Sequence, residues 1–224
     1  MHNKYKLIVF DWDGTLMDSE AQIVACMKLA IEDLQLEYRD SDSIKNIIGL
    51  GLHEACSTLY PGATVDLSQQ LTDRYRVHFL SERVLPAALF AGAGKLLHGL
   101  EQTGHFLAVA TGKGRSGLER SLKETGVGHL FHATRCADEA RSKPHPEMLQ
   151  DIMTYLGIES GHTLVVGDTE YDIQMAHNAG ASAVAVSYGV HDKQRLMSEQ
   201  PLACVDSIEE LGHWFNLAHN LPGD

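Results

Sequence analysis

The stretch Leu7-Ile8-Val9-Phe10-Asp11-Trp12-Asp13-Gly14-Thr15 decides the fold of this chain. Its first four residues are apolar, as expected for a strand buried on both faces, and two carboxylates one residue apart follow them. In α/β proteins, ligands bind outside the carboxyl ends of the strands, and a glycine lets the chain curl so that both acids converge. The pattern therefore predicts that Asp11 and Asp13 lie in a site, although a strand followed by an ordinary Asx turn uses the same residue types.

Three further polar motifs follow the first one along the chain. Thr111 closes the apolar stretch 106–110, Lys143 lies in Ser142-Lys143-Pro144, and the segment 167–172 follows the apolar stretch 163–166. Two of these motifs stand, like the first, where a predicted strand ends. They are the candidate partners of Asp11.

Residues 17–86 show helical patterns and no convincing alternating strand. Ser19-Glu20-Ala21-Gln22 has the spacing of a capping box and predicts a helix through about residue 36. Further helices are expected over 41–48, 51–59 and 67–81. These residues are interpreted as an all-helical insert, 17–86, within a core formed by 1–16 and 87–224.

From Gly92 onward, short apolar strands alternate with helices. Strands are expected over 105–110, 132–136, 163–166, 183–186 and, more weakly, 203–205. Helices are expected over 94–103, 115–125, 146–156, 171–179, 191–198 and 207–218. This alternation predicts the α/β class, with a parallel sheet covered by helices on both faces.

The four motifs, in this order, resemble those of the haloacid dehalogenase-like superfamily of phosphatases, and among them most closely the phosphoglycolate phosphatases. The motifs span Asp11 to Asp172, and the alternating pattern extends the resemblance over nearly the whole chain. The resemblance implies a Rossmann-like core with a helical cap inserted after the first motif, and Mg²⁺ as cofactor. It also implies that Asp11 and Asp168 bind the metal directly, that Asp13 contributes its backbone carbonyl, and that Asp172 acts through water or as a nearby base.

Phosphate-ester hydrolysis needs a nucleophile, neutralisation of charge and protonation of the leaving oxygen. Asp11 is the expected nucleophile, because a carboxylate can form an aspartyl-phosphate. Asp13 is the expected general acid, and dehalogenating relatives lack this second aspartate, so dehalogenation is disfavoured. The acids Asp168 and Asp172 would repel a phosphate without a cation, which favours Mg²⁺. For Asp172, an acid that stabilises a helix N-terminus is the alternative interpretation.

Other residues are expected to bind the phosphoryl group. The Thr111 hydroxyl and the Gly112 N–H can donate hydrogen bonds to a non-bridging oxygen. Lys143 would offset the charge on the nucleophile and on the phosphoryl group. Lys113 either faces the substrate or is solvated.

Substrate choice is expected to depend on the helical insert. The candidate contact loop is Gly49-Leu50-Gly51-Leu52-His53, in which Gly51 and His53 are candidate substrate-binding residues, although an ordinary interhelical turn is the alternative. Phosphoglycolate is a candidate substrate. Its carboxylate would call for a cation, and this loop contains no Lys or Arg, so Lys45 or a residue of the core would have to supply one.

Two other classes of protein share parts of the pattern. Gly112-Lys113-Gly114-Arg115-Ser116-Gly117 matches the fingerprint of NAD-binding oxidoreductases, with Asp138 and Glu139 about 20 residues further on. The fingerprint does not lie in the first strand–helix unit, and it leaves the acidic clusters unexplained. A phospho-acceptor signalling module combines a phosphorylated Asp with a metal, Thr and Lys, but has no need of a helical insert. A phosphomutase remains open, because its first half-reaction uses the same residues.

The composition narrows the set of partners. The 224 residues include 30 acidic and 18 basic side chains, for a formal net charge of −12 at pH 7. This excess opposes binding to the nucleic-acid backbone, and no apolar run approaches the roughly 20 residues that span a membrane. No signal peptide fits the N-terminal sequence. The expectation is a cytoplasmic enzyme, monomeric or weakly dimeric, whose partner is a small phosphorylated metabolite.

Overall fold

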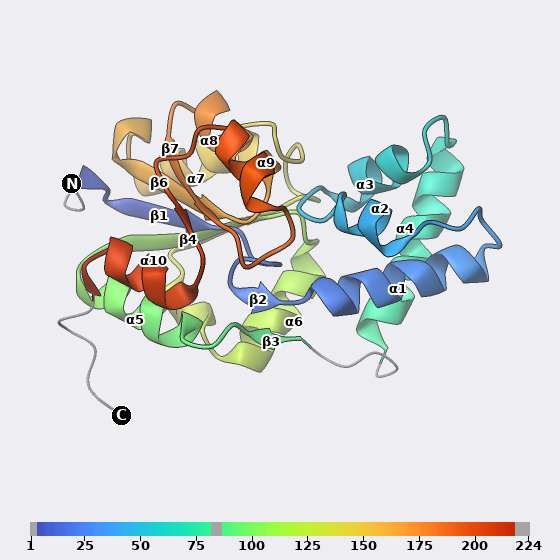
Figure 1. Cartoon of the computed structure of the whole chain (residues 1–224), viewed down its shortest axis with the longest axis horizontal. Coiled ribbons are helices and arrows are strands. Elements are labelled where there is room, and N and C mark those ends of the chain that lie inside the picture. The colour runs from blue at the N-terminus through green and yellow to red at the C-terminus, as the bar shows by residue number, and fades with distance from the viewer. Residues whose placement is uncertain (1–3, 82–86, 218–224) are drawn as a thin grey trace.

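The central sheet of the computed structural model, which describes residues 4–81 and 87–217, has six parallel strands in the order β5-β4-β1-β6-β7-β8 (Figure 1). Strand β1 therefore lies between β4 and β6. The strands are β1 (Leu7–Phe10), β4 (Phe106–Thr111), β5 (Ala133–Cys136), β6 (Thr163–Gly167), β7 (Ser182–Val186) and β8 (Cys204–Val205). The predicted α/β class with a parallel sheet is confirmed.

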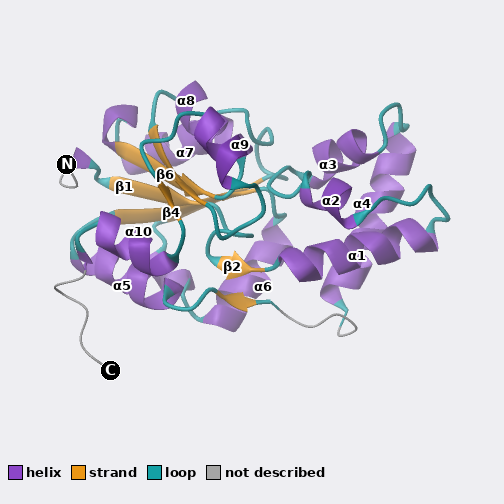
Figure 2. Cartoon of the chain, viewed as in Figure 1, coloured by secondary structure: helices purple, strands orange, loops and turns teal. Residues whose placement is uncertain are grey.

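Helices cover both faces of this sheet (Figure 2). The first face packs against α5, α6 and α10, and the second packs against α7, α8 and α9. The helices are α5 (Ala93–Gln102), α6 (Arg115–Thr125), α7 (Glu147–Leu156), α8 (Glu170–Asn178), α9 (Lys193–Ser198) and α10 (Ile208–Trp214), with short 3₁₀ turns at Gly128–Leu130 and Ser160–His162.

The side chains of β1 show why its sequence is apolar without interruption. Ile8 and Phe10 belong to the hydrophobic cluster on the first face, whereas Leu7 and Val9 belong to the cluster on the second. All four side chains are fully buried. Alternate residues of a strand point to opposite faces, so a strand covered on both sides has no polar positions. The central position of β1 places the motif that follows it in the middle of the sheet edge.

The helices between β1 and β4 form the helical insert, which lies to one side of the sheet in Figure 1. They are α1 (Glu20–Asp33), α2 (Ser41–Lys45), α3 (Leu52–Leu59) and α4 (Val65–Leu80). The insert has its own hydrophobic cluster, which includes Met27 of α1, Ile44 of α2 and Leu71 of α4. The expected helix over 41–48 is shorter in the structure, because residues 46–48 form turns. The expected boundary at residue 86 lies outside the described residues.

Two local expectations are wrong. Residues Met17–Asp18 form β2, which pairs antiparallel with β3 (Ala88–Leu89), although the sequence of 17–86 predicts no strand. Two residues are too few for an alternating pattern to be recognised.

Ser19 is the N-cap residue of α1 but makes no capping hydrogen bond, because its hydroxyl donates to Asp13 Oδ1 at 2.7 Å. The predicted capping box is therefore absent.

The segment 46–51 of the insert is hydrogen-bonded to the core. The Tyr171 hydroxyl donates to the Asn46 carbonyl at 2.9 Å, and the Arg195 guanidinium donates to Asn46 Oδ1 at 2.6 Å. The Gly51 N–H donates to the Ser142 hydroxyl at 2.7 Å. These bonds hold the segment against α8, α9 and the loop of the core that contains Ser142.

Gly112 lies against the same segment. A Cβ at this position would lie 2.5 Å from the Leu50 carbonyl oxygen and 2.6 Å from that of Gly49. Both neighbours are backbone atoms, which cannot rotate away as a side chain can. Glycine at position 112 therefore permits the close approach of insert and core.

We expect Gly112→Ala to loosen the segment 46–51. The added methyl overlaps two carbonyl oxygens, and overpacking of this kind costs about 1–3 kcal/mol. Hydrogen–deuterium exchange of peptides covering 46–51 should accelerate, and the melting temperature should fall by several degrees. Gly94→Ala is the control, since no atom lies within 4 Å of its added Cβ. Unchanged exchange at 46–51 in Gly112→Ala would show that the close approach does not constrain the segment.

Candidate active site

Most of the residues selected from the sequence lie at one edge of the sheet, because parallel strands present their carboxyl ends on the same side. Asp11 directly follows β1, and its N–H donates to the Val166 carbonyl of β6 at 2.9 Å. Thr111 is the last residue of β4, and Asp168 directly follows β6. Lys143 lies in the loop between β5 and α7.

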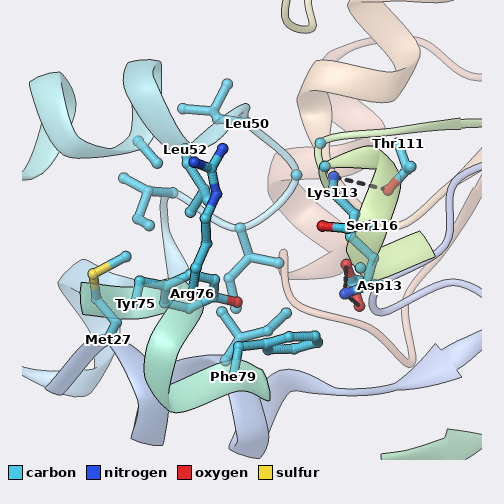
Figure 3. A pocket seen from close by; sticks show the side chains of 18 of the residues that line it. Asp13, Met27, Leu50, Leu52, Tyr75, Arg76, Phe79, Thr111, Lys113 and Ser116 are labelled. Carbon is cyan, nitrogen blue, oxygen red and sulfur yellow. Dashed lines mark hydrogen bonds and ion pairs between the residues drawn. The ribbon is translucent and has the colours of Figure 1, made fainter. Parts of the chain in front are cut away.

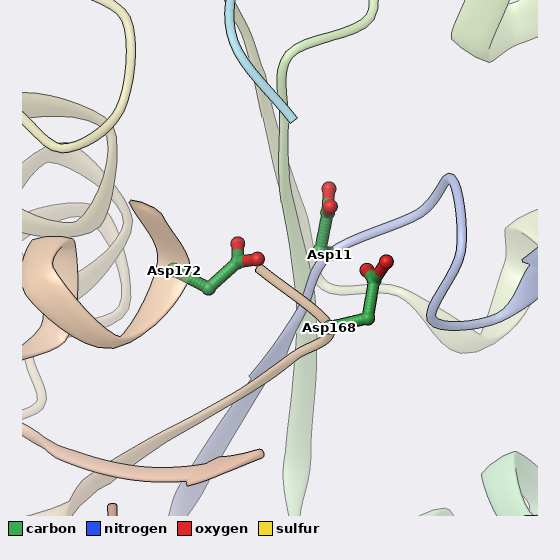
Figure 4. Close-up of side chains that lie close together, drawn as sticks. All are labelled: Asp11, Asp168 and Asp172. Carbon is green, nitrogen blue, oxygen red and sulfur yellow. The ribbon is translucent and has the colours of Figure 1, made fainter. Parts of the chain in front are cut away.

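Three aspartates converge at this edge, as Figure 4 shows. Asp11, Asp168 and Asp172 each offer a carboxylate oxygen, and these oxygens lie within 4.8 Å of one another. Each of the three residues is at most 1% exposed. Such a buried group of oxygen ligands is the kind that a hard divalent cation binds.

Lys143 joins two of these acids. Its Nζ lies 2.7 Å from Asp11 Oδ1 and 2.7 Å from Asp172 Oδ1, and its side chain is fully buried. Burial alone would lower the pKa of this ammonium, but the two carboxylates outweigh it and raise the pKa well above the usual value. Lys143 is therefore a fixed positive charge between Asp11 and Asp172.

Asp172 has both of the roles that its sequence position suggests. Its Oδ2 accepts hydrogen bonds from the Thr169 N–H at 3.1 Å and the Thr169 hydroxyl at 2.6 Å, which completes a capping box at the start of α8. Its Oδ1 accepts from Lys143. Two donors engage Oδ2 and the Lys143 ammonium engages Oδ1, so the geometry favours Asp172 as a residue that positions Lys143.

Asp168 is held in place by the loops around it. Its Oδ1 accepts a hydrogen bond from the Thr15 hydroxyl at 2.7 Å, and its Oδ2 accepts from the Val190 N–H at 2.9 Å. Burial raises its pKa to about 7, with a further contribution from the charge of Asp172. A Cβ at Gly14 would lie 2.2 Å from Asp168 Oδ2, so this glycine, which has φ +82°, is required for the carboxylate to fit.

Asp11 is the carboxylate of the cluster with the fewest contacts to its oxygens. Apart from the ion pair with Lys143, neither oxygen accepts a hydrogen bond of good geometry from the described residues. Burial raises its pKa well above the usual value, and the nearby acids add to this effect while Lys143 opposes it. Three carboxylates beside one ammonium leave an excess of two negative charges, which a divalent cation would balance. The residues present thus fit a metal ion bound by Asp11 and Asp168.

Asp13 lies apart from the three acids, in a separate set of contacts. Its carboxylate accepts hydrogen bonds from the Ser19 hydroxyl at 2.7 Å and from Lys113 Nζ at 2.9 Å to both oxygens. Lys113 Nζ also lies 4.4 Å from the centre of the Phe79 ring of α4. Of the two interpretations left open for Lys113, solvation is excluded, because its side chain is only 7% exposed.

A cavity connects this edge of the core with the helical insert (Figure 3). Asp11, Asp13, Thr111, Gly112 and Lys113 line it from the core. From the insert it is lined mainly by apolar side chains, among them Ile23, Met27, Leu50, Leu52, Tyr75 and Phe79.

The predicted contact loop reaches this cavity only in part. Gly49, Leu50 and Leu52 line it, but the exposed His53 does not, and Gly51 instead bonds to Ser142. The suggestion that His53 contacts the substrate is therefore not supported. Lys45, the cation suggested for this region, pairs with Glu20 at 2.7 Å and does not line the cavity.

Several residues that contribute to the site have no distinct signal in the sequence. Arg76 of α4 lines the cavity, and Ser19 and Thr15 hold Asp13 and Asp168. Thr15 and Ser19 stand close to the first motif, so that proximity is a usable signal. The sequence does not distinguish Arg76 from Arg74. Only the direction in which α4 presents each side chain shows that Arg76 lines the cavity and Arg74 does not.

The alternative dinucleotide site is filled by the protein itself. Both Asp138 oxygens accept from the Arg115 N–H at 3.0 Å, at the start of α6, and Glu139 pairs with the Arg115 guanidinium at 2.6 Å. A bound pyrophosphate would need this helix N-terminus, and a ribose would need one of these acids. The geometry does not support NAD binding.

Within the described ranges, the helices are too short or too polar to cross a bilayer.

We expect divalent cations to stabilise the protein by relieving repulsion among the three acids. Mg²⁺ at 100 times its dissociation constant should add about 2.7 kcal/mol and raise the melting temperature by roughly 5 °C or more. Asp168→Asn should remove most of this shift. Asp151→Asn on α7, where the acid pairs with Arg135 at 3.5 Å, should retain it. An equal Mg²⁺-induced shift in Asp168→Asn and wild type would exclude this site.

Comparisons with known proteins agree with the fold. The family model for haloacid dehalogenase-like hydrolases matches residues 8–186. A protein of Dickeya dadantii named probable phosphatase IndB is 34% identical over 209 residues, which cover 92% of this chain and 91% of that protein. A phosphoglycolate phosphatase of Mannheimia succiniciproducens is 28% identical, covering 90% of this chain and 94% of that protein.

A solved structure is similar over the same extent. The crystal structure of a protein from Clostridium acetobutylicum, described as a predicted phosphatase, superposes with a TM-score of 0.86 at 25% identity and covers 95% of this chain and 98% of that one. The similarity thus includes the helical insert as well as the sheet. The chain belongs to the haloacid dehalogenase-like hydrolase family.

Proposed function

We propose that this protein is a Mg²⁺-dependent phosphatase that hydrolyses a small phosphorylated metabolite through a phosphorylated Asp11. The observation that carries the proposal is the state of Asp11: a buried carboxylate, without hydrogen bonds of good geometry from the described residues, beside Lys143 and at the edge of a cavity. A nucleophile needs this combination of access and a neighbouring positive charge. The relatives named phosphatase and phosphoglycolate phosphatase support the same reaction class.

In the first step, Asp11 attacks the phosphorus atom and displaces the leaving oxygen. Thr111 and the Gly112 N–H would donate hydrogen bonds to the phosphoryl oxygens, and Lys143 would offset the negative charge that gathers there. Bound Mg²⁺, held by Asp11, Asp168 and the Asp13 carbonyl, supplies further neutralisation of this charge.

Asp13 would protonate the leaving oxygen and later accept a proton from the water that attacks phospho-Asp11. Asp13 lines the same cavity as Asp11, which supports its contact with the leaving group. Lys113 and Ser19 hold this carboxylate in place. Asp172 would act by positioning Lys143 rather than by binding the metal directly.

The helical insert, with boundaries at about residues 17 and 86, would act as a cap over the core formed by 1–16 and 87–224. The core-bound segment 46–51 and the apolar wall close the cavity from the insert's side and exclude water from it. A phospho-acceptor signalling module would have no use for such a closed cavity. A phosphomutase would also begin with phospho-Asp11, and the release of inorganic phosphate as product separates the two functions.

We expect Asp11→Asn to abolish turnover while preserving the fold. The change is nearly isosteric and removes one negative charge from a crowded cluster, but an amide cannot act as the nucleophile. Phosphate release from a panel of phosphorylated metabolites should fall by at least about a thousandfold. Rapid quenching of the wild type should trap a phosphoprotein that Asp11→Asn does not form. Wild-type rates in the variant would disprove the assignment.

We expect Asp13→Asn to impair esters with poor leaving groups most, because these depend on protonation. The loss in kcat for an alkyl phosphate should exceed the loss for 4-nitrophenyl phosphate by at least tenfold. Lys113→Met is the matched comparison: it breaks the same ion pair but keeps the Asp13 carboxylate, so its effect should depend less on the leaving group than that of Asp13→Asn. Equal losses for both esters in Asp13→Asn would remove the general-acid role.

A further inference from the structure

The cavity has a polar end and an apolar end. At the core, Asp11 and Asp13, which are two positions apart in the sequence, line the same cavity. If the phosphoryl group binds at Asp11 with its leaving oxygen toward Asp13, the rest of the ester extends toward the helical insert. The insert therefore contacts the leaving group and not the phosphate.

The wall that the insert provides is poorly suited to a small polar leaving group. Met27, Leu50, Leu52 and Phe79 line it, and these side chains cannot replace the hydrogen bonds that a carboxylate makes with water. Tyr75 adds a single hydroxyl to this wall. Such a wall binds apolar surface, and each buried methylene contributes about 0.8 kcal/mol.

The cations near the nucleophile are already engaged. Lys143 Nζ lies between Asp11 and Asp172, and Lys113 Nζ bonds to both oxygens of Asp13. A carboxylate only one carbon from the leaving oxygen, as in phosphoglycolate, would lie beside these pairs and against the apolar wall. The described residues leave no unengaged cation for it there.

Arg76 is the one basic side chain that the insert contributes to the described lining of the cavity. In Figure 3 its side chain points toward Leu50 and Leu52, away from Asp13. Its ion pair with Asp73 is an exposed contact at 3.4 Å between residues three positions apart, which is a weak interaction. The guanidinium is therefore available to a ligand on the insert's side of the cavity, away from Asp13.

We propose that the substrate is a phosphate monoester whose leaving group is an apolar spacer of several carbons with an anionic group at its far end, bound by Arg76. This inference rests on the proposed phosphatase function and specifies its substrate class. The apolar wall binds the spacer, and the spacer carries the anion past the engaged cations to the guanidinium. Arg76 is then the residue that determines specificity, through a charge-assisted hydrogen bond to the anion.

The test uses two matched series of esters with the wild-type protein and Mg²⁺. One series is the ω-carboxyalkyl phosphates, of which phosphoglycolate is the shortest, and the other is the n-alkyl phosphates of equal length. The kcat/KM for phosphate release should rise up to about fourfold with each of the first added methylenes. At the best length, the carboxylate should raise kcat/KM at least tenfold over the alkyl ester.

Variants separate the two parts of the subsite. Arg76→Gln should lower the carboxyalkyl-to-alkyl ratio of kcat/KM at least tenfold at the best length. Arg74→Gln is the control, because it removes the same charge from the same helix at a residue that does not line the cavity. Leu52→Ala should flatten the gain with length, whereas Val77→Ala, at an exposed position of α4, should leave it unchanged.

The outcomes distinguish this inference from the proposed function. If phosphoglycolate is the best ester of the panel, or if Arg76→Gln and Arg74→Gln have equal effects, the inference is overturned while the phosphatase assignment stands. If 4-nitrophenyl phosphate is hydrolysed but no ester of either series is, the inference is overturned; if 4-nitrophenyl phosphate and the metabolite panel are not hydrolysed either, the phosphatase assignment fails. Calorimetric binding of the same esters to Asp11→Asn then tests the subsite directly: affinity that rises with length and depends on Arg76 supports it, and affinity independent of both overturns it.

Discussion

The contact of Lys143 with Asp11 and Asp172 is the interaction on which the rest of the site depends. Three buried acids at one sheet edge would repel one another strongly, because charges out of water are poorly screened. The Lys143 ammonium lies 2.7 Å from Asp11 and from Asp172. It therefore lets β1 and the segment after β6 bring their acids together in the absence of a metal ion. When the three carboxylates are ionised, they carry two more negative charges than Lys143 offsets, and a bound divalent ion would balance them.

The arrangement around this contact assigns different tasks to similar residues. Asp172 has both oxygens bonded by the protein, Asp168 is held by Thr15 and a backbone N–H, and Asp11 is left open. Residue type alone does not separate these three aspartates. The separation comes from their neighbours. Asp172 accepts two hydrogen bonds on Oδ2 and bonds to Lys143 through Oδ1, Asp168 accepts one on each oxygen, and neither oxygen of Asp11 accepts one of good geometry from the described residues.

The sequence predicts the core far better than it predicts the insert. The uninterrupted apolar run of β1 requires a strand covered on both faces, and strand ends must then gather Asp11, Thr111 and Asp168 at one edge. Those conclusions follow from uninterrupted apolar runs that alternate with helical patterns, which a single sequence displays. By contrast, Ser19 has the spacing of a helix cap yet bonds to Asp13, because a buried carboxylate competes successfully for its hydroxyl. The direction of Arg76 depends on how α4 packs on α1, and the exposure of His53 depends on which side of α3 packs against the rest of the insert.

Long-range electrostatics and local contacts oppose each other in this protein. A net charge of −12 repels a phosphate ester at a distance, so charge on the substrate gives no help in reaching the site. Affinity must then come from contacts made at close range. Inside the site, the two lysines are already paired with aspartates, and their remaining capacity is needed for the phosphoryl group. The apolar wall of the helical insert is the one large source of binding energy that neither the net charge nor these ion pairs diminish. In the proposed reaction this wall would contact the leaving group, so the insert rather than the catalytic core would set the choice of substrate.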